Sequence, residues 1–116
     1  MILGSGIDII EVDRIAKAIK TWGDDFLNHV FTEAEIAYAK KRRFPYQHFA
    51  ARFAAKEAVL KAIGDNAHVY WKDIQISNDR HGRPVCVYKN KKFKNKIIIS
   101  ISHTENYAVA SAIITP

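Results

Sequence analysis

The sequence has little cysteine, no long apolar run and no low-complexity segment. Its single cysteine, Cys86, cannot form a disulfide within the chain, which fits a reducing compartment. No apolar run approaches the roughly 20 residues that a membrane-spanning helix needs, and acidic residues at positions 8, 11 and 13 come too early for a signal peptide. We therefore expect a cytoplasmic protein with no membrane partner.

The 116 residues, 48% of them hydrophobic, suffice for one packed core but not for two. We expect one domain over residues 1–116.

Lys and Arg outnumber Asp and Glu by 18 to 12, which gives a formal net charge of +6. Such an excess favours a polyanionic partner, whether nucleic acid, a phosphorylated cofactor or an acidic protein. Much of it lies in runs at 40–43 and 89–96, a pattern typical of solvated charged faces.

The most informative stretch is residues 49–63, which is rich in alanine and free of glycine and proline. It predicts a long helix that ends at Gly64. Three side chains fall on one line of such a helix, at i, i+4 and i+8: Phe53, Glu57 and Lys61. Because this line begins with Phe53, we expect Glu57 and Lys61 at the edge of the core. Two interpretations stay open: an ordinary Glu57–Lys61 ion pair, or a carboxylate that binds a metal or accepts a proton.

Residues 1–10 predict a strand with a carboxylate in its most apolar part. Gly4 and Gly6 weaken a strand unless another backbone or a ligand approaches closely. Asp8 stands between two isoleucines, and an unpaired carboxylate in an apolar interior costs several kcal/mol. Asp8 must therefore be exposed, hydrogen-bonded or bound to a metal, and a structural capping role is the plain alternative.

Helices are expected over the next third of the chain. Apolar spacing predicts a helix over 11–22, with a basic stripe on its other face: Arg14, Lys17 and Lys20. A short helix capped by Asp24 should follow, to residue 30. Thr32 and Glu35 form a capping box that opens a helix to about residue 43, and Pro45 interrupts the chain before the long helix.

The remaining segments alternate like strands, at 70–76, 85–88, 97–102 and 107–114. Turn residues between the first two predict a hairpin. The order of strand, helices and antiparallel meander predicts an α+β fold, with a long helix packed on an antiparallel sheet.

Side chains suited to phosphate and metal chemistry recur along these elements. Asp8 and Glu57 supply hard oxygen ligands of the kind that Mg²⁺ takes when it also holds substrate phosphates. Lys61 and Arg52 offer cations to phosphate oxygens. A predicted hairpin tip adds two hydroxyls and an imidazole for phosphate binding or proton transfer: Ser102, His103 and Thr104. Each signal is weak alone; together they describe a metal-assisted site for a phosphorylated substrate.

Six blocks carry a resemblance to one known family: GSGIDIIEVDRI at 4–15, FTEAE at 31–35, RFAAKEA at 52–58, KAIG at 61–64, GRP at 82–84 and SISHT at 100–104. In this order they resemble motifs of the holo-[acyl-carrier-protein] synthases, the short 4'-phosphopantetheinyl transferases. The resemblance implies transfer of the 4'-phosphopantetheine arm from coenzyme A to a serine of apo acyl carrier protein. The by-product would be adenosine 3',5'-bisphosphate. The resemblance also implies Mg²⁺ as the cofactor and a wider role in fatty acid biosynthesis.

The resemblance also assigns residues. Asp8 and Glu57 would bind Mg²⁺ and act in catalysis with Lys61 and His103, and either a metal-bound water or Glu57 would deprotonate the serine. Contacts to coenzyme A are implied for Arg52, Lys61, Arg83, Pro84, Ser102, His103 and Thr104. The acidic carrier protein would dock on Arg14, Lys17 and Lys20. Lys41, Arg42 and Arg43 are an alternative site for the 3'-phosphate of coenzyme A. The family is trimeric, with active sites between subunits.

Two features depart from the family pattern: Asp65 and Asn66 follow Gly64 where many members have Thr-Gly, and the run from Lys91 to Lys96 is unusually basic and has no functional account.

Two other classes of protein compete with the family that the motifs resemble. A nucleic-acid-binding module fits the +6 charge, but the sequence lacks an aromatic strand surface or a recognition helix, so we expect no nucleic-acid partner. A Mg²⁺-dependent phosphohydrolase would use the same ligands with water as nucleophile.

Overall fold

The computed structural model describes residues 1–64 and 68–116. In chain order the elements are β1 (Gly4–Glu11), α1 (Val12–Trp22), α2 (Asp24–Val30), α3 (Glu33–Lys40), α4 (Pro45–Ile63), the 3₁₀ turn η1 (Trp71–Asp73), β2 (Ile74–Asn78), β3 (Pro84–Tyr88), β4 (Lys96–His103) and β5 (Tyr107–Thr115). The α+β class is confirmed. The loop expected at 65–67 lies outside the described residues. No helix of the described ranges is long and apolar enough to cross a membrane.

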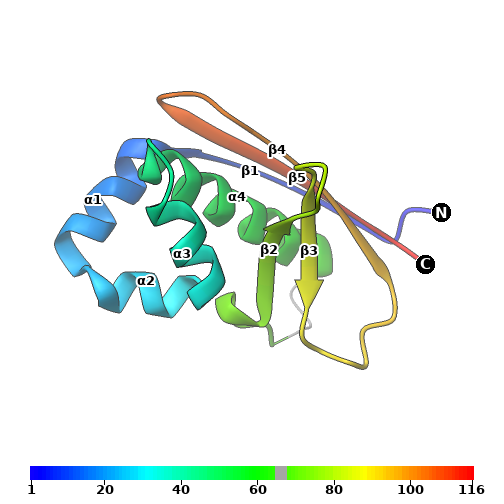
Figure 1. Cartoon of the computed structure of the whole chain (residues 1–116). Coiled ribbons are helices and arrows are strands. Elements are labelled where there is room, and N and C mark those ends of the chain that lie inside the picture. The colour runs from blue at the N-terminus through cyan, green and yellow to red at the C-terminus, as the bar shows by residue number, and fades with distance from the viewer. Residues whose placement is uncertain (65–67) are drawn as a thin grey trace.

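The described strands form two antiparallel sheets rather than one meander. β5 lies between β1 and β4, whereas β2 and β3 pair only with each other. Figure 1 shows α4 running along one face of the β1–β5–β4 sheet, with α1, α2 and α3 gathered toward one end and the β2–β3 hairpin beside α4. The expected single meander is therefore wrong, because β3 and β4 do not pair and the C-terminal hairpin pairs with β1 instead.

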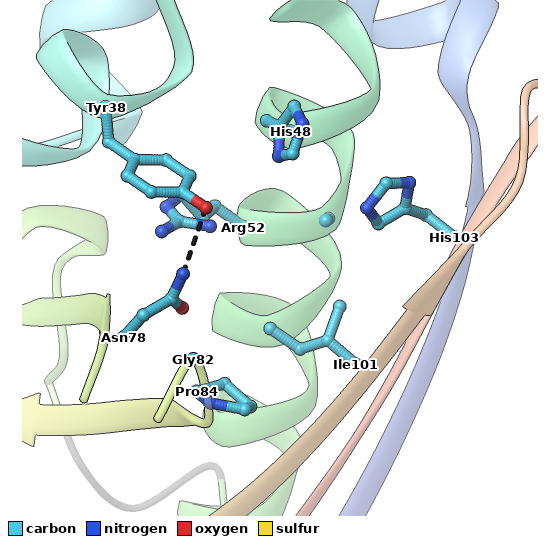
Figure 2. Close-up of a pocket in the computed structure, with 9 residues that line it drawn as sticks. Tyr38, His48, Arg52, Asn78, Gly82, Pro84, Ile101 and His103 are labelled. Carbon is cyan, nitrogen blue, oxygen red and sulfur yellow. Dashed lines mark hydrogen bonds between the residues drawn. The ribbon is translucent and has the colours of Figure 1, made fainter. Parts of the chain in front are cut away.

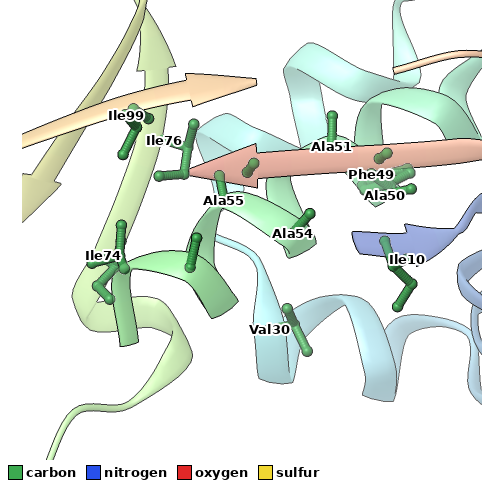
Figure 3. Packing of buried hydrophobic residues seen from close by; sticks show 14 of the residues in the cluster. Ile10, Val30, Phe49, Ala50, Ala51, Ala54, Ala55, Ile74, Ile76 and Ile99 are labelled. Carbon is green, nitrogen blue, oxygen red and sulfur yellow. The ribbon is translucent and has the colours of Figure 1, made fainter. Parts of the chain in front are cut away.

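α4 packs against this sheet through small side chains, which lets the two backbones approach closely. A Cβ added to Gly4 would lie 2.2 Å from the carbonyl oxygen of Ala62, and one on Gly6 would lie 2.0 Å from that of Ala58. β5 faces the helix with a row of buried residues: Ala108, Ala110, Ala112 and Ile114. Figure 3 shows the alanines of α4 among larger core residues such as Ile10, Ile74 and Ile76. The close approach expected from the glycines of β1 is confirmed.

Local signals predicted several helix boundaries and missed others. The capping box is present, since Glu35 Oε1 accepts from the Thr32 amide at 2.8 Å and Thr32 Oγ1 accepts from the Glu35 amide at 3.3 Å. α2 begins as expected, but its N-cap is Gly23 and Asp24 makes no capping hydrogen bond. α3 ends at Lys40, earlier than predicted.

The strand expected over 70–76 is shorter than predicted. A 3₁₀ turn takes its first half, because the Asp73 carboxylate accepts from the Tyr70 amide at 3.0 Å.

Cys86 faces the core from β3, and burial raises the pKa of its thiol to about 12. This cysteine is therefore an unreactive packing residue, as expected from its apolar neighbours.

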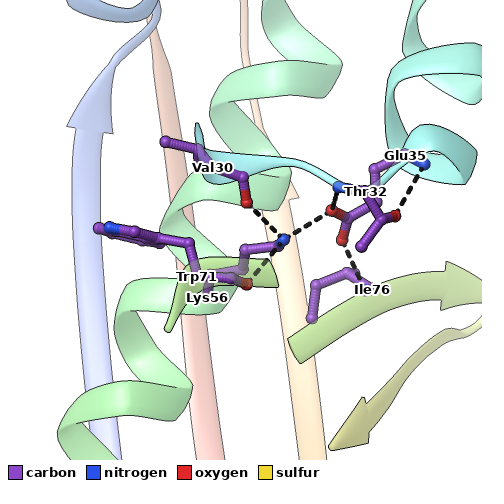
Figure 4. A network of polar contacts seen from close by, with 6 residues as sticks. All are labelled: Val30, Thr32, Glu35, Lys56, Trp71 and Ile76. Atoms are coloured by element: carbon purple, nitrogen blue, oxygen red, sulfur yellow. Dashed lines mark hydrogen bonds and ion pairs between the residues drawn. The ribbon is translucent and has the colours of Figure 1, made fainter. Parts of the chain in front are cut away.

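A buried ion pair joins the helices to the second sheet. Lys56 Nζ lies 2.6 Å from Glu35 Oε1, and both side chains are fully buried. The same nitrogen donates to the carbonyl oxygens of Val30 at 2.7 Å and Trp71 at 3.1 Å, while Glu35 Oε2 accepts from the Ile76 amide at 2.7 Å (Figure 4). Burial lowers the pKa of Lys56 and the charge of Glu35 opposes that shift. The pair therefore ties α2, α3, η1 and β2 to α4.

Candidate functional site

Asp8 and Lys61 meet where β1 crosses the last turns of α4. Lys61 Nζ lies 3.3 Å from Asp8 Oδ1 and donates to the carbonyl oxygen of Ile7 at 3.0 Å. The Asp8 side chain is 16% exposed and that of Lys61 is 53% exposed. The ordinary Glu57–Lys61 ion pair is not formed among the described residues, because Lys61 is paired with Asp8 instead. Asp8 lies inside β1 and caps none of the described helices, so the structural capping role that was the alternative is also wrong.

Glu57 completes a cluster of one ammonium and two carboxylates. Burial raises the pKa of Glu57 above its ordinary value, the negative charge of Asp8 raises it further, and Lys61 opposes both effects. The two carboxylates are thus close enough to repel each other. A further cation near Asp8 and Glu57 would relieve this repulsion.

The donor set fits a hard divalent cation that the protein holds only in part. Mg²⁺ prefers oxygen ligands and is commonly bound by one or two carboxylates together with waters and substrate phosphates. Asp8 and Glu57 provide that number. In the described part of the chain no group of three or more His, Cys, Asp or Glu side chains forms a metal site. The arrangement therefore suits a metal bound jointly with a phosphorylated substrate.

A second cluster lines a pocket beside the N-terminal half of α4 (Figure 2). The pocket has a volume of about 220 Å³. Its walls come from α3, α4, the β2–β3 hairpin and β4: Tyr38, His48, Ala51, Arg52, Asn78, Gly82, Pro84, Ile101 and His103. The structure thus brings together three residues predicted to bind coenzyme A, namely Arg52, Pro84 and His103.

Arg52 places a buried positive charge in the wall of this pocket. The residue is only 4% exposed, and its guanidinium carbon lies 4.0 Å from the centre of the Tyr38 ring. Tyr38 is held in turn by Asn78, whose Nδ2 donates to the phenolic oxygen at 3.0 Å. Arg52 Nε is buried and has no hydrogen-bond partner among the described residues. A ligand with oxygen acceptors would satisfy this donor.

His103 faces a second histidine across the pocket. Its Nδ1 lies 3.1 Å from Gln47 Oε1, and its ring is edge-on to that of His48, with centroids 5.2 Å apart. His48, Tyr38 and Asn78 were not predicted as site residues from the sequence. For His48 a signal existed, because it lies four residues before Arg52 and therefore on the same face of α4.

Three other predicted residues do not line this pocket. The Arg83 side chain is exposed, while its amide donates to Asp79 Oδ1 at 3.0 Å in the β2–β3 turn. Ser102 is exposed near the end of β4. Thr104 Oγ1 accepts from the amides of Asn106 and Tyr107 at 3.3 and 3.2 Å and so shapes the β4–β5 turn.

The carboxylate cluster and the pocket lie on different sides of α4. Arg52 and Glu57 are five positions apart, which places them about 140° apart around a helix. His48 and Lys61 are separated by about 20 Å along the helix axis. Within one chain no hydrogen bond or ion pair of the described residues links the two groups. Asp8 and Glu57 therefore do not meet His103 inside a single subunit.

The basic stripe of α1 is exposed. Lys17 Nζ lies 3.0 Å from Asp13 Oδ2 in an exposed i, i+4 pair, and Lys20 Nζ lies 5.4 Å from the centre of the Tyr46 ring. Arg14 is also exposed. These side chains form a positive surface that is open to a partner.

Two further basic segments are also exposed. After α3, Arg42 stacks on Tyr38 with its guanidinium carbon 4.1 Å from the ring centre, which places this arginine close to the pocket. The run from Lys91 to Lys96 covers most of the β3–β4 connection and the first residue of β4. Within it, Phe93 packs on Tyr88 with ring centroids 5.2 Å apart. That packing accounts for the shape of the connection but not for its charge.

Known proteins resemble this chain over nearly its whole length. Residues 4–112 match the family model described as the 4'-phosphopantetheinyl transferase superfamily. The holo-[acyl-carrier-protein] synthase of Koribacter versatilis is 46% identical over 123 residues, which cover 98% of each chain. That of Thermodesulfovibrio yellowstonii is 48% identical over 115 residues, which cover 99% of this chain and 100% of the relative.

Solved structures of such synthases also resemble this chain. The holo-(acyl-carrier-protein) synthase of Bacillus anthracis in complex with CoA (3',5'-ADP) superposes with a TM-score of 0.86 and 37% identity, over 98% of this chain and 96% of that one. The Helicobacter pylori enzyme in complex with coenzyme A gives a TM-score of 0.85 and 30% identity, over 96% and 99%. The chain therefore belongs to the 4'-phosphopantetheinyl transferase superfamily. It is a transferase of the holo-[acyl-carrier-protein] synthase type.

Proposed function

We propose that this protein transfers the 4'-phosphopantetheine arm of coenzyme A to a serine of apo acyl carrier protein, in a Mg²⁺-dependent reaction that supports fatty acid biosynthesis. The products are holo carrier protein and adenosine 3',5'-bisphosphate. The observation that carries the proposal is the cluster of Asp8, Glu57 and Lys61 at the crossing of β1 and α4. The names of the relatives and the coenzyme A complexes of two solved structures support the substrates.

Asp8 and Glu57 are the residues that would hold Mg²⁺. When bound there, Mg²⁺ would neutralise charge on the phosphoryl group under attack and on the leaving phosphate. Lys61 is half exposed beside the carboxylates, and there it would bind phosphate oxygens of coenzyme A. The Lys61–Asp8 contact also orients the Asp8 carboxylate before substrate binds.

The pocket of Figure 2 is the proposed site for another part of coenzyme A. Arg52 and His103 would bind phosphate there, and Pro84 offers an apolar wall for the adenine. Three predicted residues at the margin, Arg83, Ser102 and Thr104, are proposed to contact the same ligand from outside the pocket. Support comes from Arg52 Nε, which has no hydrogen-bond partner in the described parts of the chain, and from the polar, cationic lining.

A homotrimer with active sites between subunits would join the two clusters. One coenzyme A molecule could then bind the pocket of one subunit and the carboxylates of its neighbour. The sheet face away from α4 exposes apolar side chains that such a contact would bury, with Ile7 and Ile9 each 65% exposed and Ile98 55% exposed. An exposed apolar patch of this kind is typical of an interface.

The acidic carrier protein is proposed to dock on the stripe of Arg14, Lys17 and Lys20. All three side chains are exposed on α1. Complementary charge of this kind raises the association rate and selects the partner more than it raises affinity.

Intact mass spectrometry of the carrier protein tests the proposal. The protein is incubated with coenzyme A, Mg²⁺ and an apo acyl carrier protein, and the carrier is weighed. We expect the carrier to gain one phosphopantetheine arm, and we expect EDTA to prevent the gain. Cleavage of coenzyme A without a change in carrier mass would instead indicate a phosphohydrolase, and an unchanged carrier with intact coenzyme A would contradict the proposal.

A further inference from the structure

His48 stands in a positively charged corner of the pocket of Figure 2. Tyr38 of α3 contacts its ring edge-on at 5.8 Å between centroids, and His103 of β4 does so at 5.2 Å. Arg52 follows one helical turn later in α4, and Arg42, just after α3, stacks on the Tyr38 ring at 4.1 Å. Among the residues that line this pocket there is no carboxylate.

These surroundings favour the neutral imidazole while the pocket holds no anion. Burial lowers the pKa of His48, and the positive charges of His103, Arg52 and Arg42 lower it further. Within the described ranges, the His48 ring makes no hydrogen bond, so its nitrogens are available to a ligand. Arg52 Nε, buried and without a partner among the described residues, is a second unused donor in the same wall.

We propose that His48 binds a phosphate group of coenzyme A together with Arg52 and His103, and that it takes up a proton from solvent as the phosphate enters. The inference rests on the proposed function and deepens it, because it makes co-substrate affinity depend on proton concentration. The physical cause is a change in the sign of the local field. The surrounding cations repel a proton on His48, whereas a bound phosphate attracts one and accepts its hydrogen bond.

Proton uptake by His48 and titration of the ligand change the number of bound protons in opposite directions. A phosphate monoester titrates near pH 6, and a cationic pocket favours its dianion, so the ligand itself releases protons on binding. Net uptake therefore comes from the protein. Affinity should rise as the pH falls from 8 to 7, by at most about tenfold per pH unit, which is the limit for one linked proton.

Isothermal titration calorimetry with adenosine 3',5'-bisphosphate tests the inference. Binding enthalpies are measured at pH 7.5 in several buffers that differ in ionisation enthalpy, and the slope of one against the other gives the number of protons taken up. We expect a positive slope for the wild-type protein. The slope should be lost in His48→Phe, which keeps a ring, and in His48→Gln, which keeps a hydrogen-bonding group. His29→Phe, the same change at an exposed histidine of α2, should keep the wild-type slope.

Each outcome is decisive. A zero or negative slope in the wild-type protein, or an unchanged positive slope in both His48 variants, would overturn the inference and leave the proposed function standing. If the folded wild-type protein bound neither adenosine 3',5'-bisphosphate nor coenzyme A, the proposed function would fail, and the inference with it.

Discussion

The ammonium nitrogen of Lys61 lies 3.3 Å from a carboxylate oxygen of Asp8, across the boundary between the last turns of α4 and the first strand. The same nitrogen is hydrogen-bonded to the carbonyl oxygen of Ile7. Because Lys61 is half exposed, this pair contributes little to stability. Its consequence is positional: Asp8 is held facing α4, on the side where Glu57 lies.

Replacing Glu57 with glutamine should separate activity from stability. We expect Glu57→Gln to lower the rate of phosphopantetheine transfer on the order of 10²–10³-fold, as is usual when a transition-state charge loses its stabiliser. We also expect a higher melting temperature at pH 7 without Mg²⁺. Folding raises the pKa of Glu57, so the stabilising contribution of its protonated form is full below the ordinary pKa and is lost as the pH rises through the raised one.

Thermal unfolding followed by circular dichroism between pH 3 and 8 measures this effect. The gain in melting temperature should shrink as the pH falls, because Glu57 of the wild type then becomes protonated in both the folded and the unfolded state. Glu33→Gln, at an exposed glutamate of α3, is the matched control and should change neither activity nor the pH profile. An identical melting profile for wild type and Glu57→Gln would show that the carboxylate is not destabilised.

Adding one methyl group at Gly6 should loosen the crossing of β1 and α4. The new Cβ would lie 2.0 Å from the carbonyl oxygen of Ala58, a backbone atom that cannot move alone. We expect Gly6→Ala to lower the free energy of unfolding by about 1–3 kcal/mol, the usual cost of overpacking, or by more. Urea unfolding measures the loss. Ser5→Ala, at the exposed neighbour, should stay within about 0.5 kcal/mol of wild type, and an equal effect of the two substitutions would refute the close approach.

Removing the charge of Lys56 should destabilise the fold strongly. Lys56→Met leaves the carboxylate of Glu35 buried without a counter-charge, which typically costs about 3–5 kcal/mol. Urea unfolding again gives the difference, and Lys89→Met, at an exposed lysine after β3, is the control. A loss below about 1 kcal/mol would mean that the pair is not buried as described.

Charge reversal on α1 should act on one substrate only. We expect Arg14→Glu/Lys17→Glu to raise KM for the carrier protein by about tenfold or more, equivalent to 1.4 kcal/mol, and to leave KM for coenzyme A unchanged. The reason is the loss of complementary charge at an exposed surface, and added salt should weaken carrier binding by wild type in the same way. Lys91→Glu/Lys92→Glu makes the same change in the β3–β4 connection. Equal effects of the two pairs would remove the stripe as a docking surface.

Much of the fold follows from local signals in the sequence. The capping box of Thr32 and Glu35 was predictable because both partners lie within one helical turn. Gly4 and Gly6 predicted a close neighbour because glycine in a strand is otherwise unfavourable. The sequence could not indicate that this neighbour is α4 rather than a ligand, since the contact spans more than fifty residues.

The parts that were missed depend on contacts between distant segments. Glu35 was predicted as a cap, and it is one, but its ion pair with Lys56 forms only once α3 and α4 pack together. His48 lies on one helical line with Arg52 and Lys56, a stripe as regular as the one through Glu57. The role of His48 depends on its contact with His103 of β4. The helical periodicity of the sequence gives no information about that contact.

Asp8 and Glu57 should bind one divalent cation between them, and Mn²⁺ binding tests this expectation most directly. Mn²⁺ prefers the same oxygen ligands as Mg²⁺, and its electron paramagnetic resonance signal reports the free ion in the presence of protein and coenzyme A. We predict that wild type and Glu33→Gln bind one Mn²⁺ per chain, and that Asp8→Asn and Glu57→Gln lose this binding. Equal Mn²⁺ affinity in all four proteins would contradict the account.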